Sequence, residues 1–373
     1  PRKGGPASPP NVFVRGMPSQ YTAVLIDGVR IDAQSGSGGA GWNTIPASQI
    51  ERIEILRGPA AAIYGSDASA GVIQIFTKAA KKGFSPSLEL GLGTHGTRKA
   101  VSHLTGGNAR FDYAIGLAYE ESKGFDIRPK VATANHDRDG YLQHSGNLKL
   151  GWNINPAHRL EVSALDSSSK AQYDTSVRDD ITMSDLRTQS LAWRANWSEQ
   201  YQTRLVATRS ADRNQTLTTA PSTSKTEISS LLWHNEYRIG IHQFTVDIEH
   251  RQDRFKSTSG VPASRVDKRQ QQSIALGYGL ASGAHTVQVN VRSDDDSDFG
   301  SKATGNIGYA YKINPTWRVS ASTGTTYRTP TFYQRFSKYG KADLVPEFGR
   351  NQELAVHWAQ AGQSFSATLY RGR

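Results

Sequence analysis

The sequence contains no cysteine. This absence excludes a disulfide scaffold, a thiol nucleophile, an iron–sulfur cluster and a cysteine-based zinc site. The sequence also lacks any unbroken apolar run near the roughly 18–20 residues that a membrane-spanning helix requires, and its mean hydropathy is −0.55. Transmembrane helices are therefore excluded. A transmembrane β-barrel is not, because only every second residue of its strands needs to be apolar.

Dense basic runs with interleaved aromatic residues are also absent, although the net charge is +11 from 44 Lys and Arg against 33 Asp and Glu. The cations are spread singly, and the densest group, Lys78, Lys81 and Lys82, lies in an expected linker. We therefore expect no nucleic-acid partner. The first residues carry no apolar segment of a signal peptide, so we expect a mature or trimmed form.

Alternating apolar and polar residues dominate the chain from about Ser87 onward. Leu88, Leu90 and Leu92 alternate with small or polar residues, and segments such as 148–154 and 307–313 repeat the pattern. A period of two over such lengths predicts strands with one apolar face. We expect about fifteen strands.

The connections between these segments alternate in length. Short turns are expected at 106–109, 155–157, 198–201, 239–241, 281–284, 314–316 and 360–363, and long polar segments at 122–140, 168–187, 210–226, 253–269, 293–301 and 327–349. This pattern predicts an up-and-down meander whose two ends face different environments, as in outer-membrane barrels. A soluble sandwich or propeller does not require it. Aromatic residues near strand ends fit membrane-interface girdles, namely Trp152, Trp197, Tyr309, Trp317, Tyr327 and Trp358.

The first 78 residues have a different character. Short apolar pieces at 11–15, 23–27, 52–56 and 72–77 are separated by Gly-rich turns, with a short helix expected near 47–50. We predict a small mixed α/β plug domain over 1–78, a linker over 79–86 and a barrel over 87–373. The barrel meander stops on an unpaired strand, so we expect the barrel to be incomplete at its C-terminal end. We also expect the plug to be incomplete at its N-terminal end.

The motifs of the N-terminal part resemble the plug of TonB-dependent outer-membrane receptors. The resemblance rests on VFVRG at 12–16, VLIDGVR at 24–30, IERIEILRGP at 50–59, YGSDA at 64–68 and GVIQIFT at 71–77, and on YRTPTF at 327–332 and DLVPE at 343–347 in the barrel. It implies an all-β fold, an antiparallel barrel of 22 strands with a plug in its lumen, and TonB as a partner. It also implies a bacterial outer-membrane location, contact with outer-membrane lipid, a monomer and no enzymatic activity.

Within that family, the chain most resembles the cobalamin receptors, on GFD at 124–126, HDRDGY at 136–141, QYD at 172–174 and DLR at 185–187. In those receptors an Asp cluster on two early loops binds calcium. The resemblance implies calcium ligands at Asp126, Asp137, Asp139, Asp174 and Asp185, with Asp179 or Asp180 as substitutes for Asp185. Calcium prefers about six to eight oxygen ligands, which carboxylates on neighbouring loops can supply. Solvated loop acids are the alternative.

The glycine-rich segment 36–41 imitates a dinucleotide motif, but 42–46 does not begin a long helix. We interpret it as an apical plug loop, where the resemblance implies substrate contacts, and predict Gln34, Ser35, Ser37 and Trp42 there. The segment 294–298 imitates an EF-hand, yet Phe299 occupies the position of its glycine.

The sequence therefore predicts an energy-coupled importer of cobalamin with calcium-ordered loops. The alternative cargo is a ferric siderophore or haem, for which His136 is a possible ligand. A passive porin would need no plug, and an outer-membrane enzyme would need a catalytic constellation that the sequence does not display.

Overall fold

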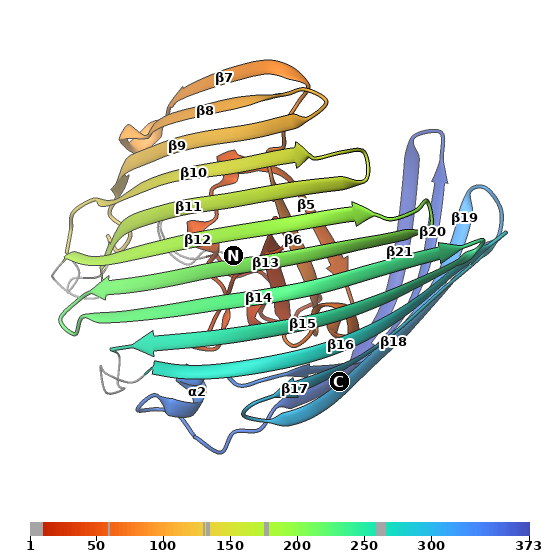
Figure 1. Ribbon diagram of the computed structural model, residues 1–373. Helices are drawn as coiled ribbons and strands as arrows, with labels where there is room; N and C mark the ends of the chain where they lie inside the picture. Colours follow the sequence, from red (N-terminus) through yellow and green to blue (C-terminus); the bar gives the residue numbers. More distant parts are fainter. Residues whose placement is uncertain (1–9, 59, 130, 132–134, 175–178, 259–265) are drawn as a thin grey trace.

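The computed structural model describes residues 10–373 apart from 59, 130, 132–134, 175–178 and 259–265. The fold is a curved antiparallel sheet with a smaller N-terminal unit on its concave side (Figure 1). Within the described residues the large sheet has 15 strands, each paired with its neighbours in sequence, from β7 at one edge to β21 at the other. The predicted meander is confirmed.

The strands of the large sheet are long and joined mostly by short turns. Their bounds are β7 (Gly83–Leu92), β8 (Arg98–Gly107), β9 (Phe111–Phe125), β10 (Asp139–Asn153), β11 (His158–Asp174), β12 (Asp179–Asn196), β13 (Tyr201–Leu217), β14 (Ser222–Ile239), β15 (His242–Ser257), β16 (Val266–Ser282), β17 (His285–Asp296), β18 (Gly300–Lys312), β19 (Trp317–Arg328), β20 (Glu347–Gln360) and β21 (Gln363–Gly372). The sheet thus begins at Gly83, before the expected boundary at 87.

Several segments that we predicted as long loops are strands in the structure. The predicted loops over 168–187 and 210–226 were too long. In the structure β11 extends to Asp174 and β12 begins at Asp179, and only residues 218–221 separate β13 from β14. The reason is physical: beyond the apolar belt both faces of a strand are polar, so the period-two signal disappears although the backbone ladder continues. The longest connections are 126–138 and 329–346; the second contains helix α2 (Phe332–Phe336).

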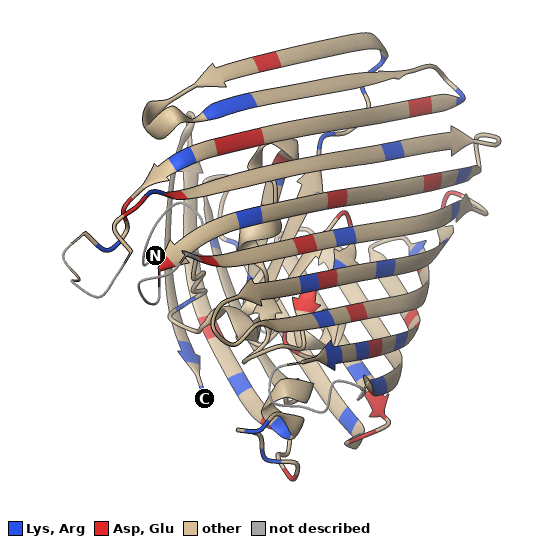
Figure 2. Ribbon diagram, turned by 90° about the vertical axis from the view of Figure 1, so that its left-hand side faces the viewer, with Lys and Arg blue, Asp and Glu red and all other residues tan. Residues whose placement is uncertain are grey.

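The apolar belt faces outward, and aromatic residues mark its short-turn end. Trp152 stacks on Phe111, Trp193 meets Trp197 edge to face, and Trp317 lies beside Trp358. These pairs agree with the expected girdle. Tyr327 does not belong to it: its ring is fully buried in the lumen and its hydroxyl accepts a 2.7 Å hydrogen bond from Gln271. Charged residues occur on most strands (Figure 2).

The N-terminal unit is a mixed α/β domain, as predicted. Its sheet has the order β2-β1-β6-β5, with β1 and β6 parallel, and a hairpin of β3 and β4 lies beside it. The elements are η1 (Ser19–Tyr21), β1 (Thr22–Ile26), β2 (Val29–Arg30), β3 (Asp32–Ala33), β4 (Gly39–Ala40), η2 (Trp42–Thr44), η3 (Ala47–Gln49), β5 (Ile50–Arg57), α1 (Ala61–Tyr64) and β6 (Gly71–Thr77); η4 (Thr94–Gly96) follows β7. The helix expected near 47–50 is the 3-10 helix η3. The segment 11–15 is not a strand and forms only an isolated bridge between Val14 and Met17.

The N-terminal unit is packed against the inner face of the sheet. Its core of Val24, Ile26, Ile73 and Ile75 is continuous with Leu165 and Leu186 of β11 and β12. Burial of this shared apolar surface holds the unit in the lumen. None of the described helices is long and apolar enough to cross a membrane.

Candidate functional site

The segment between β3 and η2 forms the tip of the N-terminal unit at the long-loop end of the sheet. Glycines permit its shape: Gly36, Gly38 and Gly39 have φ values of +54°, +88° and +91°, which side chains with a Cβ rarely adopt. At Gly39 an added Cβ would lie 3.2 Å from the Gln20 backbone nitrogen. We call residues 33–43 the apical loop.

A cavity of about 760 Å³ lies between the apical loop and the inner faces of β10 to β13. Ser35, Ser37 and the glycines of the loop form one side. The strands provide the other side with neutral and acidic side chains, including Gln172, Tyr173, Thr182, Ser184, Asp212 and Asn214. A cavity of this size, with polar groups that converge on it, is typical of a ligand site.

Hydrogen bonds between the loop and the strands fix the floor of this cavity. The Asn43 side chain donates to Ser184 Oγ at 3.1 Å, and Asn214 donates to the same oxygen at 2.8 Å. Gln143 on β10 donates to the Asn43 carbonyl at 3.3 Å. The position of the loop is therefore coupled to three strands.

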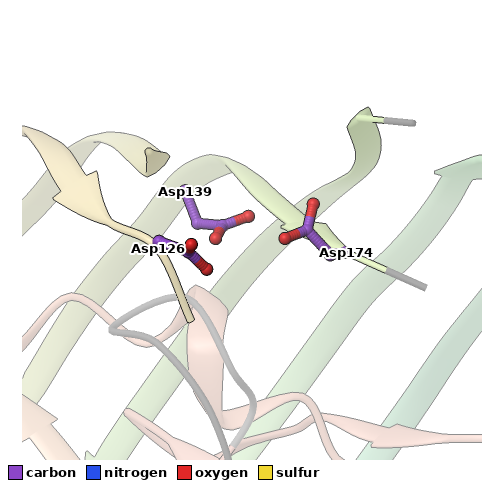
Figure 3. A group of neighbouring side chains, drawn as sticks. All are labelled: Asp126, Asp139 and Asp174. Atoms are coloured by element: carbon purple, nitrogen blue, oxygen red, sulfur yellow. The ribbon is translucent and has the colours of Figure 1, made fainter. Parts of the chain in front are cut away.

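Three carboxylates meet at the rim of the cavity. Asp126, Asp139 and Asp174 each offer an oxygen, and these oxygens lie within 4.8 Å of one another (Figure 3). The three come from the long-loop ends of adjacent strands: Asp126 follows β9, Asp139 begins β10 and Asp174 ends β11. Asp139 and Asp174 also line the cavity.

Polar contacts around the three carboxylates orient them. The Arg128 backbone N–H donates to Asp126 at 2.8 Å, and the Ile127 N–H donates to Asp139 at 3.1 Å. His136 Nδ1 lies 3.0 Å from Asp126, and this hydrogen bond holds the pKa of Asp126 below its usual value. Asp126 is therefore ionised at neutral pH, as a cation ligand must be.

The donor set fits calcium. The group contains only carboxylate oxygens, which hard cations prefer, and two of its three members are buried. Asp126, Asp139 and Asp174 would hold the ion.

The other predicted ligands lie elsewhere. Asp185 is on the outward face of β12, where it accepts a 2.7 Å hydrogen bond from Ser168, while its neighbours Ser184 and Leu186 are buried inward. The structure thus does not bring Asp185 to the group. Asp180 is buried on the inward face of β12 but outside the group of three, and Asp137 lies two residues before Asp139, also outside it. The side chain of Asp179 lies outside the described residues.

Of the four predicted substrate residues, two line the cavity and two do not. Ser35 and Ser37 line the cavity, whereas Gln34 is buried and anchors the loop: its backbone N–H donates to Thr226 at 2.9 Å and its side chain to Asp253 at 3.3 Å. Trp42 packs on the core beneath the loop and lines a second cavity of about 230 Å³ beside β8 to β11.

The segment 327–334 clamps the apical loop from the opposite wall. Arg328 donates to the carbonyls of Gln20 (3.2 Å) and Ser37, and Thr331 donates to the Gly36 carbonyl at 2.8 Å. The same Thr331 caps helix α2. Sequence reasoning did not identify this clamp, nor Asp212 and Asn214. The inward-facing positions of β13 were the available signal for the latter pair.

Comparisons with known proteins agree with this architecture. Residues 2–72 match the TonB-dependent receptor plug domain, and residues 84–373 match the family described as TonB dependent receptor-like, beta-barrel. A curated relative, the vitamin B12 transporter BtuB of Vibrio cholerae serotype O1, is 28% identical over 99% of this chain and 61% of its own length. BtuB of Vibrio vulnificus is 27% identical over 95% of this chain and 59% of its own length. The chain thus spans about three-fifths of these relatives.

Solved structures share the fold at lower identity. The siderophore receptor PirA from Acinetobacter baumannii superposes with a TM-score of 0.83 at 20% identity, covering 96% of this chain and 63% of its own. A ferric enterobactin receptor (PfeA) from Pseudomonas aeruginosa, in a mutant form in complex with enterobactin, gives a TM-score of 0.83 at 18% identity, covering 100% of this chain and 68% of its own.

Proposed function

The chain belongs to the TonB-dependent receptor family, and from this premise we propose that it is an outer-membrane receptor that binds cobalamin for energy-coupled import. In this proposal the cargo binds in the cavity between the apical loop and β10 to β13, and TonB acts on the plug. Calcium held by Asp126, Asp139 and Asp174 orders the loops that close over the cargo.

The observation that carries the proposal is the placement of the three carboxylates. They lie at the long-loop ends of β9, β10 and β11, at the rim of the cavity. Asp139 and Asp174 also line the cavity. A cation there would hold Asp126, which follows β9, against Asp139 and Asp174 of β10 and β11, so ion binding and cargo binding would be coupled. The curated relatives described above are named as vitamin B12 transporters, which supports the same cargo.

The chemistry of the wall also favours a cargo rich in neutral polar groups. Hydroxyl, amide and backbone groups predominate, and Arg128 is the one cation among the described residues that line the cavity, against Asp139, Asp174 and Asp212. An anionic ferric chelate would require a more basic wall. His136, the possible haem ligand, contacts Asp126 instead.

A calorimetric titration in detergent tests the cargo. Cyanocobalamin, a ferric siderophore and haem are each titrated into the receptor in millimolar calcium. We expect saturable binding of cyanocobalamin alone. Binding of the ferric chelate or haem by a folded receptor that ignores cyanocobalamin would overturn the assignment and favour that cargo.

A further inference from the structure

A second cavity, of about 230 Å³, adjoins the cavity in which the proposed cargo binds. It lies beneath the apical loop, between η2, η3 and the inner faces of β8 to β11, and we call it the side cavity. Asn43 and Ala171 line both cavities. The Asn43 side chain donates to Ser184 in the wall of the larger cavity, and its carbonyl accepts from Gln143 in the wall of the side cavity. Asn43 therefore forms part of the partition between the two.

The charged groups around the side cavity are already paired. Lys99 donates to Glu89 at 2.7 Å and lies directly opposite Glu120 in the register of β8 and β9. The hydroxyl of Tyr141 also donates to Glu120. Lys170, which adjoins the cavity through β11, is exposed on the outward side of that strand. The side cavity therefore favours a neutral group over an anion, because an anion would lose its hydration without gaining a free cation.

Polar side chains without partners surround the side cavity. Ser145 lines it from β10 and is 7% exposed, and its hydroxyl has no hydrogen-bond partner among the described residues. Trp42 lines it from the plug, and its indole N–H is likewise buried without a partner there. One inward row closer to the short turns, the side-chain amides of Gln49 and Asn147 are buried and also lack partners in the described chain. An added Cβ at Gly116 would collide with oxygens of both amides, so glycine is required beside them.

The chemistry of these groups selects the ligand. Buried polar groups are normally hydrogen-bonded, so a site that leaves several unmet gains most from a ligand that both donates and accepts. A carboxamide does both, with two N–H donors and a carbonyl acceptor. The volume of the side cavity admits an arm of a few non-hydrogen atoms and excludes a whole cobalamin. Cobalamin carries carboxamide arms around its corrin ring.

We propose that the side cavity is a specificity subsite that receives one carboxamide arm of the cargo held in the larger cavity. This proposal rests on the proposed function, which places the cargo next to Asn43. Ser145 and Trp42 bind the arm. Glu120 disfavours a carboxylate at the same position, since like charges repel where no free cation lies nearby.

The test compares cyanocobalamin with its monocarboxylate isomers, in each of which one carboxamide arm is replaced by a carboxylate. Each is titrated calorimetrically into the receptor in millimolar calcium. For the isomer altered in the arm that enters the side cavity, we expect binding to wild type about tenfold weaker than that of cyanocobalamin. In Ser145→Ala, cyanocobalamin should bind about fivefold more weakly, because a buried hydrogen bond is lost, while that isomer changes by less than about twofold. The difference between the two ligands therefore narrows.

Ser163→Ala is the matched control, because Ser163 is an inward-facing serine of β11, opposite Lys149, that lines neither cavity. It should keep the wild-type difference between cyanocobalamin and every isomer. A second variant tests the cavity itself. Ala118→Leu adds bulk to the wall that β9 contributes and should weaken cyanocobalamin binding about tenfold, through steric exclusion of the arm. Ala207→Leu, exposed on the outward face of β13, should bind as wild type does. Thermal midpoints report the folding of each variant.

The outcomes separate the subsite from the proposed function. If wild type binds cyanocobalamin but no isomer distinguishes Ser145→Ala from Ser163→Ala, the side cavity holds only water and the subsite is overturned. Unchanged cyanocobalamin affinity in a folded Ala118→Leu receptor would overturn it as well, and both results would leave the cargo assignment intact. If wild type does not bind cyanocobalamin at all, the proposed function fails, and the subsite fails with it.

Discussion

The side chain of Asn351 on β20 donates a 2.6 Å hydrogen bond to the backbone carbonyl of Ser69 in the plug. The two residues are 282 positions apart in the chain, and both are buried. The contact therefore joins the plug to the wall at a place where water cannot replace the donor. Its loss should lower the stability of the docked plug by the full cost of an unsatisfied buried carbonyl.

We predict that Asn351→Ala destabilises the docked plug by about 1–2 kcal/mol, because a buried acceptor loses its donor. The expected result is a lower thermal midpoint in detergent and faster protease cleavage within residues 1–78. Gln352→Ala, at an exposed neighbouring position of the same strand, is the control. Equal behaviour of the two variants would show that this contact does not hold the plug.

Alanine substitutions at two glycines of the apical loop, Gly36 and Gly39, should differ in their effect on cargo binding. Gly39→Ala combines a φ of +91° with a Cβ contact of 3.2 Å to backbone atoms of Ser19 and Gln20, whereas Gly36→Ala at φ +54° meets nothing within 4 Å. A left-handed conformation alone costs about 1–2 kcal/mol. We expect Gly39→Ala to weaken cyanocobalamin binding at least threefold more than Gly36→Ala in calorimetric titration. Similar affinities would mean that loop position does not limit binding.

Arg328 should control how long the cargo remains bound. Its guanidinium donates to the Gln20 and Ser37 carbonyls and lies over the Tyr21 ring at 5.4 Å. Lysine cannot supply this fork of donors. For Arg328→Lys we predict about tenfold faster cargo dissociation, equivalent to about 1.4 kcal/mol, in a displacement experiment. Arg318→Lys, exposed on the same strand, should dissociate as wild type does. An unchanged cargo dissociation rate in Arg328→Lys would show that the contacts of Arg328 with the Gln20 and Ser37 carbonyls do not retain the cargo.

The sequence was sufficient for the meander because the outward belt imposes a period of two. It was insufficient where that belt ends. Beyond it, strands such as β11 and β12 continue with polar residues on both faces, so their extensions were interpreted as loops. The buried position of Tyr327 shows the same limit, since alternation assigns a face only when the register of the whole strand is known.

The outward position of Asp185 follows from the apolar–polar alternation of β12 alone. It shares the odd-numbered face of β12 with Leu191 and Trp193, which lie on the outward belt, so the alternation itself places it away from the lumen. Asp126, Asp139 and Asp174 could be nominated from the resemblance. Their convergence, however, depends on the pairing of β9, β10 and β11, which no short motif specifies.

The most direct test of the account is the linkage between calcium and cobalamin at the three carboxylates. Cyanocobalamin affinity is measured by calorimetry in millimolar calcium and again with a chelator, for wild type, Asp139→Asn, Asp174→Asn and the outward control Asp185→Asn. We predict that chelation weakens cyanocobalamin binding at least tenfold in wild type and Asp185→Asn, and that Asp139→Asn and Asp174→Asn bind weakly in both conditions. Calcium-independent binding in wild type, or an Asp185→Asn variant that loses calcium dependence while Asp139→Asn retains it, would contradict the account.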